Sequence, residues 1–198
     1  MRVVAGEFGG RVIDSPSEKT TRPTTDRVRE SMFSSIYSRL ADLSGTRVLD
    51  AFAGSGALGI EALSRGAQRA VFFERDANAR KVLEGNLSSL GLRPPRATVA
   101  GRDVVSDAAA GSVLLGGAPY GLVLMDPPYA LEPSEVHAFV RDLLSGGALA
   151  PGAVIVYEHA IANRQSAADA FGADAAFEVT GQKKYGKIGV TYVKCLGA

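Results

Sequence analysis

The sequence is poor in the residues that build disulfide and metal frameworks. Its 198 residues include one cysteine, two histidines and no tryptophan. A single cysteine cannot form a disulfide within the chain, and His137 and His159 are not spaced as ligands of a structural zinc site. No run of apolar residues is long enough for a signal peptide or a membrane span. We therefore expect a cytoplasmic monomer without metal and without a membrane segment.

The chain also lacks a strong charge of one sign. Its formal net charge is +1, so overall charge does not indicate a general polyanion binder. Locally, the segment from Lys183 to Lys194 contains four lysines and no acidic residue, while Arg22, Arg27 and Arg29 stand near acidic residues. These groups fit either a nucleic-acid contact or an ordinary solvated face.

The arrangement of apolar and turn residues predicts one α/β domain. Residues 2–14 indicate a hairpin around a glycine-rich turn, and residues 25–43 form an amphipathic helix pattern with Thr24 or Thr25 as its cap. Five strands follow, separated by helical patterns, and two more strands close the chain. The strands are predicted at residues 46–52, 69–74, 96–101, 120–126, 152–159 and, in the last pair, within 177–195; the helices are predicted at 58–66, 76–91, 103–111 and 133–147. This alternation predicts a mainly parallel, seven-stranded sheet with helices on both faces. The last hairpin adds an antiparallel strand, which is common at the edge of such sheets.

Acidic residues stand at four strand ends of this predicted sheet. Asp50, Glu74 and Asp126 end their strands, and Asp103 follows its strand closely. Ligands of open α/β sheets bind outside the carboxyl ends of the strands. The ligand is therefore expected beside several carboxylates.

The first strand runs into "DAFAGSGALG", where Gly54, Gly56 and Gly59 fit a G-x-G-x-x-G pattern. Glycines there permit a tight turn and the close approach of a ligand, and the pattern suits both NAD enzymes and methyltransferases. Asp50 distinguishes them, because a carboxylate about 4 Å from a pyrophosphate charge is repelled by roughly 4 kcal/mol at an effective dielectric constant of about 20. A ligand with an ammonium and a sulfonium group, such as S-adenosylmethionine, is attracted instead. The loop residues Phe52, Ala53 and Ser55 complete the predicted cofactor contact.

The next two acidic positions extend this site along the nucleoside. Glu74, with Arg75 beside it, is predicted to accept hydrogen bonds from both ribose hydroxyls. Asp103 is a candidate partner of the adenine amino group. The alternatives are structural: Glu74 would belong to a helix start capped by Asp76, and Asp103 would cap its own helix.

The segment "DPPY", Asp126 to Tyr129, has the features of a binding site for an exocyclic amine. Pro127 and Pro128 fix two backbone φ angles and lack N–H donors, so nearby carbonyls can face a ligand. Asp126 accepts one N–H of the amine, the Pro127 carbonyl accepts the other, and Tyr129 stacks on the ring. This orientation aims the nitrogen lone pair at a methyl sulfonium, and Asp126 can take up the departing proton. The alternative is a rigid surface turn.

Four segments together resemble the RsmD family of 16S ribosomal RNA guanine-N2 methyltransferases. They are "RPTTDRVRESMFSSI", "LDAFAGSGALGIEALSRGA", "DPPY" and "KKYGKIGVTYV". The resemblance implies a Rossmann-like class I methyltransferase domain over residues 21–198, preceded by a small β-hairpin extension over residues 1–20. It also implies S-adenosylmethionine as cofactor and a guanine of small-subunit ribosomal RNA as substrate, within an assembled particle or a late precursor.

The resemblance further assigns residues outside the two motifs. Thr24 and Arg27 are candidates to close over the methionine end of the cofactor, and Ser34 departs from the asparagine common after the phenylalanine of this helix. The residues expected to contact RNA are Arg2, Arg11, Lys19, Lys183, Lys184, Tyr185 and Lys187, with phosphate contacts from the cations and either base stacking or core packing by Tyr185.

Other functions remain compatible with the same motifs. DNA adenine or cytosine amino-methyltransferases and protein glutamine methyltransferases also use "DPPY" or close variants. An NAD(P)-dependent oxidoreductase and a non-catalytic RNA-binding module are the alternatives from other classes.

Overall fold

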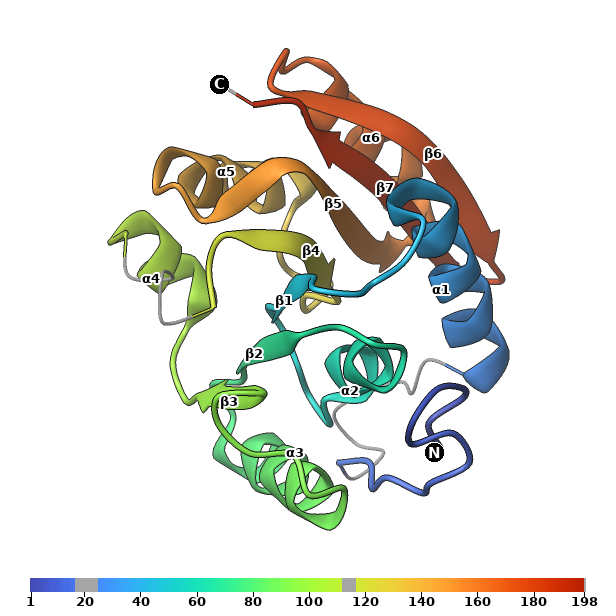
Figure 1. The fold of residues 1–198 in the computed structure, drawn as a ribbon. Coiled ribbons are helices and arrows are strands. Elements are labelled where there is room, and N and C mark those ends of the chain that lie inside the picture. The colour runs from blue at the N-terminus through green and yellow to red at the C-terminus, as the bar shows by residue number, and fades with distance from the viewer. Residues whose placement is uncertain (17–24, 112–116, 198) are drawn as a thin grey trace.

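A computed structural model describes residues 1–16, 25–111 and 117–197, whose arrangement is shown in Figure 1. The described residues form one seven-stranded sheet with helices on both sides. The strands are β1 (Arg47–Asp50), β2 (Arg69–Phe73), β3 (Ala97–Ala100), β4 (Tyr120–Met125), β5 (Leu149–Ala160), β6 (Phe177–Tyr185) and β7 (Ile188–Cys195). The helices are α1 (Asp26–Leu40), α2 (Ala57–Ser64), α3 (Ala77–Ser89), α4 (Val104–Ala109), α5 (Pro133–Ser145) and α6 (Arg164–Gly172), with a 3-10 turn η1 (Ile161–Asn163) before α6.

The strand order is β3-β2-β1-β4-β5-β7-β6, and β1 to β5 run parallel to one another. The order reverses between β1 and β4, which is where ligands bind in sheets of this type. The predicted parallel sheet is confirmed. The antiparallel strand β7 lies one position inside the edge, between β5 and β6, so β6 rather than β7 is the edge strand.

Two hydrophobic clusters hold the layers together, one on each face of the sheet. The first joins α1, α2 and α3 to the sheet through residues such as Phe33, Leu63 and Leu83. The second joins α4, α5 and α6 through residues such as Val104 and Phe139. Helices therefore cover both faces, as the alternation of strands and helices predicts, and only the strand ends stay accessible to a ligand.

Local sequence signals explain where several helices start. The Thr25 side chain accepts the Val28 N–H at the start of α1, and Asp76 accepts the Asn78 and Ala79 N–H groups at the start of α3. Both residues were predicted as caps, because a short polar side chain satisfies backbone donors that a helix start leaves unpaired. Helix α6 was not predicted.

The first 14 residues pack against the domain rather than projecting from it. The Met1 and Val3 N–H groups bond to the carbonyls of Ile13 and Arg11, which forms the predicted hairpin pairing. The fully buried Glu61 of α2 accepts the Val4 and Ala5 N–H groups. The hairpin is thus tied to the helix that follows the glycine-rich loop.

Candidate active site

The glycine-rich loop, residues 51–56, is fixed from both sides by the neighbouring strands. The Ala51 N–H donates to the Leu124 carbonyl of β4, and the Ala53 N–H donates to the Phe73 carbonyl of β2. The loop therefore lies over the carboxyl ends of β1, β2 and β4. A ligand at this loop also reaches the residues that follow β2 and β4.

The glycines of this loop serve two different purposes. Gly54 has φ +53°, and a Cβ placed on it would meet no other atom within 4 Å. A Cβ on Gly56 would lie 2.3 Å from Leu83, and one on Gly59 would lie 2.4 Å from the Phe72 ring. At Gly56 and Gly59 the missing Cβ makes room for the protein's own side chains, whereas Gly54 has open space beside it. Contacts of Gly54 and Gly56 with a cofactor stay predictions.

Asp50, at the end of β1, is bonded to the segment that follows the glycine-rich loop. Its carboxyl group is 2% exposed and accepts the Gly59 N–H at 2.9 Å, at the start of α2. Burial raises the pKa of Asp50 to about 7, and the charges of Asp126 and Glu74 act in the same direction while the bond from Gly59 opposes them. Asp50 therefore both orients the loop and makes the site more negative when it ionises.

Glu74 follows β2 and is bonded to the same loop. Its carboxylate accepts the Gly54 N–H at 2.8 Å through Oε2 and the Asp76 N–H at 2.8 Å through Oε1. Glu74 thus lies at Gly54, the glycine of this motif that has open space beside it. Asp76 caps α3, as the structural alternative for this segment predicts. A carboxylate accepts up to about four hydrogen bonds, so these two leave capacity for ribose hydroxyls.

The acidic residue after β3 is a helix cap in this structure. Asp103 Oδ1 accepts the Val105 and Ser106 N–H groups, and Oδ2 is 2.9 Å from Arg75 Nη1. The structural alternative for Asp103 is confirmed. Contacts of Asp103 with adenine and of Arg75 with the nucleoside stay predictions.

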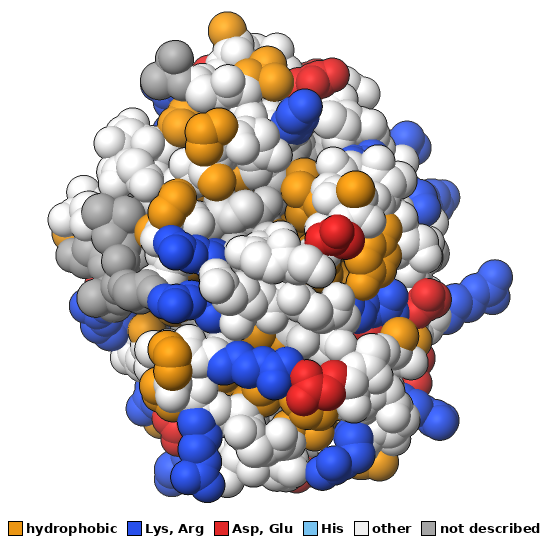
Figure 2. Space-filling model, viewed as in Figure 1, with side chains coloured by type: hydrophobic (Ala, Val, Ile, Leu, Met, Phe, Trp, Pro, Cys, Tyr) orange, Lys and Arg blue, Asp and Glu red, His pale blue; other side chains and the backbone are white. Residues whose placement is uncertain are grey.

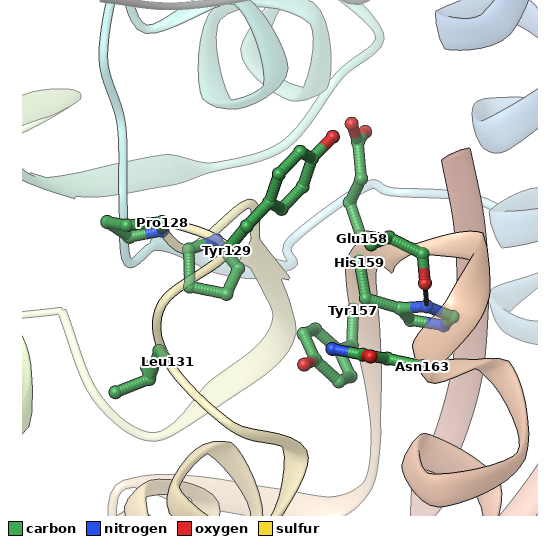
Figure 3. A pocket seen from close by; sticks show the side chains of 9 residues that line it. Pro128, Tyr129, Leu131, Tyr157, Glu158, His159 and Asn163 are labelled. Carbon is green, nitrogen blue, oxygen red and sulfur yellow. Dashed lines mark hydrogen bonds between the residues drawn. The ribbon is translucent and has the colours of Figure 1, made fainter. Parts of the chain in front are cut away.

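The "DPPY" segment forms one side of a pocket at the end of β4. Pro127 is buried, whereas Pro128 and Tyr129 are exposed, and the Tyr129 side chain is among the large exposed hydrophobic groups. The Pro128 carbonyl accepts the Leu131 N–H at 2.9 Å, which leaves the Pro127 carbonyl without a hydrogen bond from the described residues. Figure 3 shows the residues that line the pocket. The segment therefore places an exposed aromatic ring beside the carboxyl end of β4.

Asp126 and Asp50 lie on neighbouring strands and on the same face. Asp50 pairs in register with Leu124 of β4, and Asp126 stands two residues further on. Burial raises the pKa of Asp126 to about 6. No arginine or lysine in the described ranges forms an ion pair with either carboxyl group. Two buried acidic groups on neighbouring strands favour a cationic ligand or N–H donors beside them.

Other predicted cofactor residues have mainly structural contacts. The Phe52 ring packs edge-on against Phe139 with a centroid distance of 6.1 Å, and the Ser55 carbonyl accepts an N–H from Asn86. Arg27 is exposed in the first turn of α1. Thr24 and Lys19 lie outside the described residues.

The predicted RNA contacts fall on the N-terminal hairpin and the β6–β7 turn. Arg2 pairs with Asp26 at 3.3 Å and Arg11 donates to the Ser89 carbonyl, yet both remain exposed. Lys183 and Lys184 near the end of β6 and Lys187 in the following turn are exposed. Figure 2 shows the face of the molecule seen in Figure 1. Basic side chains are spread over it with acidic ones among them, and they do not form one large basic patch.

Tyr185 packs differently from a base-stacking residue. Its ring is half-buried against the core under α1, and its hydroxyl lies 2.7 Å from Ser31 Oγ. The core-packing alternative is therefore favoured for Tyr185. The contact fixes the lysine-rich turn against α1.

Sequence reasoning missed the opposite wall of the pocket. Glu158 and His159, at the end of β5, line it together with Asn163 of η1 (Figure 3). The signal was present, because Glu158 is a further acidic residue at a strand end. That β5 lies beside β4 depends on the strand order, which the sequence pattern does not give.

The described part of the chain contains no cluster of three or more histidine, cysteine, aspartate or glutamate residues arranged to hold a metal ion. None of the helices in these ranges has the length and apolar character needed to cross a membrane.

Comparisons with known proteins cover almost the entire chain. The sequence model of a family described as conserved hypothetical protein 95 matches residues 1–194. The chain is 35% identical to ribosomal RNA small subunit methyltransferase D of Escherichia coli K12, over 82% of this chain and 76% of that protein. It is 30% identical to the protein of the same name from Haemophilus influenzae, over 80% and 78% of the two chains. The solved structure of yhhF from Escherichia coli is similar with a TM-score of 0.78 and 28% identity, covering 100% of this chain and 99% of the other.

Proposed function

Because this chain belongs to the RsmD family, described as conserved hypothetical protein 95, we propose that it methylates the exocyclic N2 amine of one guanine in small-subunit ribosomal RNA, using S-adenosylmethionine. Its relatives are named as ribosomal RNA small subunit methyltransferases. The observation that carries the finer proposal is the pairing of a carboxylate and an open carbonyl, Asp126 and Pro127, beside an exposed aromatic ring.

The residues around the glycine-rich loop suit S-adenosylmethionine in charge and in the room beside Gly54. Gly54 has open space beside its Cα, and Glu74 is anchored to its N–H. Glu74 and the loop would hold the ribose, while the negative charge of Asp50 would favour the cationic methionine end. When bound, this cofactor supplies a methyl group on a positively charged sulfur. The same charges disfavour the pyrophosphate of NAD(P), which argues against the oxidoreductase alternative.

The "DPPY" residues would orient the target amine. Asp126 accepts one N–H, the Pro127 carbonyl accepts the second, and Tyr129 stacks on the base. Both hydrogen bonds draw the nitrogen lone pair out of conjugation with the ring and fix its direction, so orientation supplies much of the rate enhancement. The nitrogen gains the methyl group and loses one proton, which Asp126 accepts directly or through water. A pKa of about 6 leaves Asp126 largely ionised at pH 7 and still basic enough to take the proton.

Binding to RNA would depend on exposed cations away from the crevice. Lys183, Lys184 and Lys187 project from the β6–β7 turn, which Tyr185 fixes against α1. Phosphate contacts position the protein without reading sequence. The guanine must leave its stack to reach Asp126, so a folded particle that already exposes it is the favoured substrate. This substrate would place the protein in the cytoplasm.

Methyl transfer from labelled S-adenosylmethionine tests the proposal. Small subunits from cells lacking this protein, naked 16S RNA, DNA and a release factor would be compared, and the modified nucleotide would be mapped by mass spectrometry. We expect label in one guanine of the small subunit and none after Asp126→Ala. Label only in DNA or in the release factor would refute the ribosomal assignment.

A further inference from the structure

Residues at the end of β5 line the pocket opposite the "DPPY" segment. These residues have no role in the methyl transfer proposed above. Pro127, Pro128, Tyr129 and Leu131 line one side of this pocket; Tyr157, Glu158, His159, Ala160 and Asn163 line the other. In Figure 3 the polar ends of Tyr129 and Glu158 extend in the same direction from these two sides. Among the described residues that line the β5 side, Glu158 is the one with a carboxylate.

The strand register places Glu158 beside Asp126. Met125 of β4 pairs with Tyr157 of β5, so the next residue of each strand is Asp126 and Glu158. Neighbouring strands lie about 4.8 Å apart, and side chains alternate between the faces. Leu124 and Val156 both belong to the core under α1, α2 and α3, so Asp126 and Glu158 leave the sheet on that same face.

The backbone that carries Glu158 is rigid. Glu158 is 2% exposed and pairs in register with Val190 of β7. The next residue, His159, has its Nδ1 2.8 Å from the Ala160 carbonyl and its Nε2 2.8 Å from Thr191 Oγ1. A carbonyl only accepts, so Nδ1 carries a proton, and burial lowers the pKa of His159 and favours the neutral ring. Nε2 then accepts from Thr191, whose oxygen also accepts an N–H from Gln182.

We propose that Glu158 selects guanine as the target base by accepting the hydrogen bond of its N1–H group, next to the amine held by Asp126 and Pro127. This inference rests on the proposed function and adds the residue that decides which base is accepted. Glu158 is a specificity-determining residue in this scheme, and it takes no part in moving the methyl group.

The chemistry of the bases makes a carboxylate selective at this position. Guanine places two donors side by side, N1–H and the N2 amine. Adenine and cytosine place an unprotonated ring nitrogen next to their amine, and its lone pair repels a carboxylate. A site built to accept the N–H groups of one base rejects a base that lacks them.

A base analogue separates this role from the transfer itself. 2-Aminopurine keeps the 2-amine of guanine but has an unprotonated N1. The substrate would be a small-subunit particle reconstituted with RNA in which the target guanine, or 2-aminopurine at the same position, is the only change. Wild type should methylate the guanine substrate at least about tenfold faster. Glu158→Gln, whose amide can donate to N1, should reduce that preference at least tenfold, mainly through a changed KM.

Two further measurements make each result decisive. Binding of S-adenosylhomocysteine and the melting temperature should be unchanged in Glu158→Gln, and Glu178→Gln, an exposed glutamate of β6, is the matched control with a wild-type preference. Equal rates of wild type on the two substrates would overturn the inference without any variant. So would an unchanged preference in a folded Glu158→Gln. If wild type modified neither particle but another substrate, the proposed function would fail instead.

Discussion

The buried carboxyl group of Asp50 makes the stability of this protein depend on pH in a predictable way. Burial raises its pKa to about 7 in the folded protein, from an ordinary value of 3.8. The folded state therefore binds more protons than the unfolded state between these values, and the free energy of unfolding decreases as pH rises through this window. A difference of about 3 pKa units corresponds to about 4 kcal/mol at pH 8, as an upper bound.

Replacing Asp50 by asparagine removes this pH dependence. The asparagine oxygen can still accept the Gly59 N–H that Asp50 accepts at 2.9 Å, so the loop keeps its support. Any penalty for the new amide group is the same at all pH values. We expect the stability of Asp50→Asn relative to wild type to increase from pH 5 to pH 8, by between about 1 and 2.6 kcal/mol.

Urea denaturation of both proteins at pH 5, 6, 7 and 8, without ligand, measures this difference. Asp126, with a raised pKa of about 6, is present in both proteins and largely cancels. Binding of S-adenosylhomocysteine, measured in parallel, should be weaker in Asp50→Asn, because its ammonium group loses a nearby negative charge. A stability difference that stays constant from pH 5 to pH 8 would show that Asp50 does not titrate in this range and would refute the reasoning.

Four further variants test other parts of the site. Asp126→Ala should abolish methyl transfer and leave S-adenosylhomocysteine affinity within about threefold of wild type; measurable turnover would contradict its role in orienting the amine. Glu74→Ala should weaken that affinity by about tenfold to a hundredfold in calorimetry, because it removes charge-assisted hydrogen bonds worth about 1.5–3 kcal/mol. Gly59→Ala should destabilise the fold by about 1–3 kcal/mol in urea, since its Cβ would lie 2.4 Å from the Phe72 ring; an unchanged midpoint would mean that the helix shifts freely. Lys183→Ala combined with Lys184→Ala should lower RNA affinity and reduce the slope of log K against log salt by about 2, whereas an unchanged slope would mean that neither lysine contacts phosphate.

The sequence determined the elements whose signals are local. The alternation of strands and helices, the Thr25 and Asp76 caps and the turn at Gly54 all depend on residues a few positions apart, and all appear as predicted. Helix α6 gave no such signal. Only Ala167 and Phe171 of its nine residues are buried, so it lacks the apolar stripe by which an amphipathic helix is recognised.

Only the tertiary structure decided which chemical groups meet. Gly56 and Gly59 proved to accommodate Leu83 and Phe72, and Tyr185 to bond to Ser31, because segments far apart in the sequence pack together there. Strand order is likewise set by packing, so the placement of β7 between β5 and β6 and of Glu158 beside Asp126 was not visible in the pattern. A sequence fixes which side chains stand at strand ends through the period of its local structure. Which of those ends become neighbours depends on the burial of whole faces, and that is a property of the complete chain.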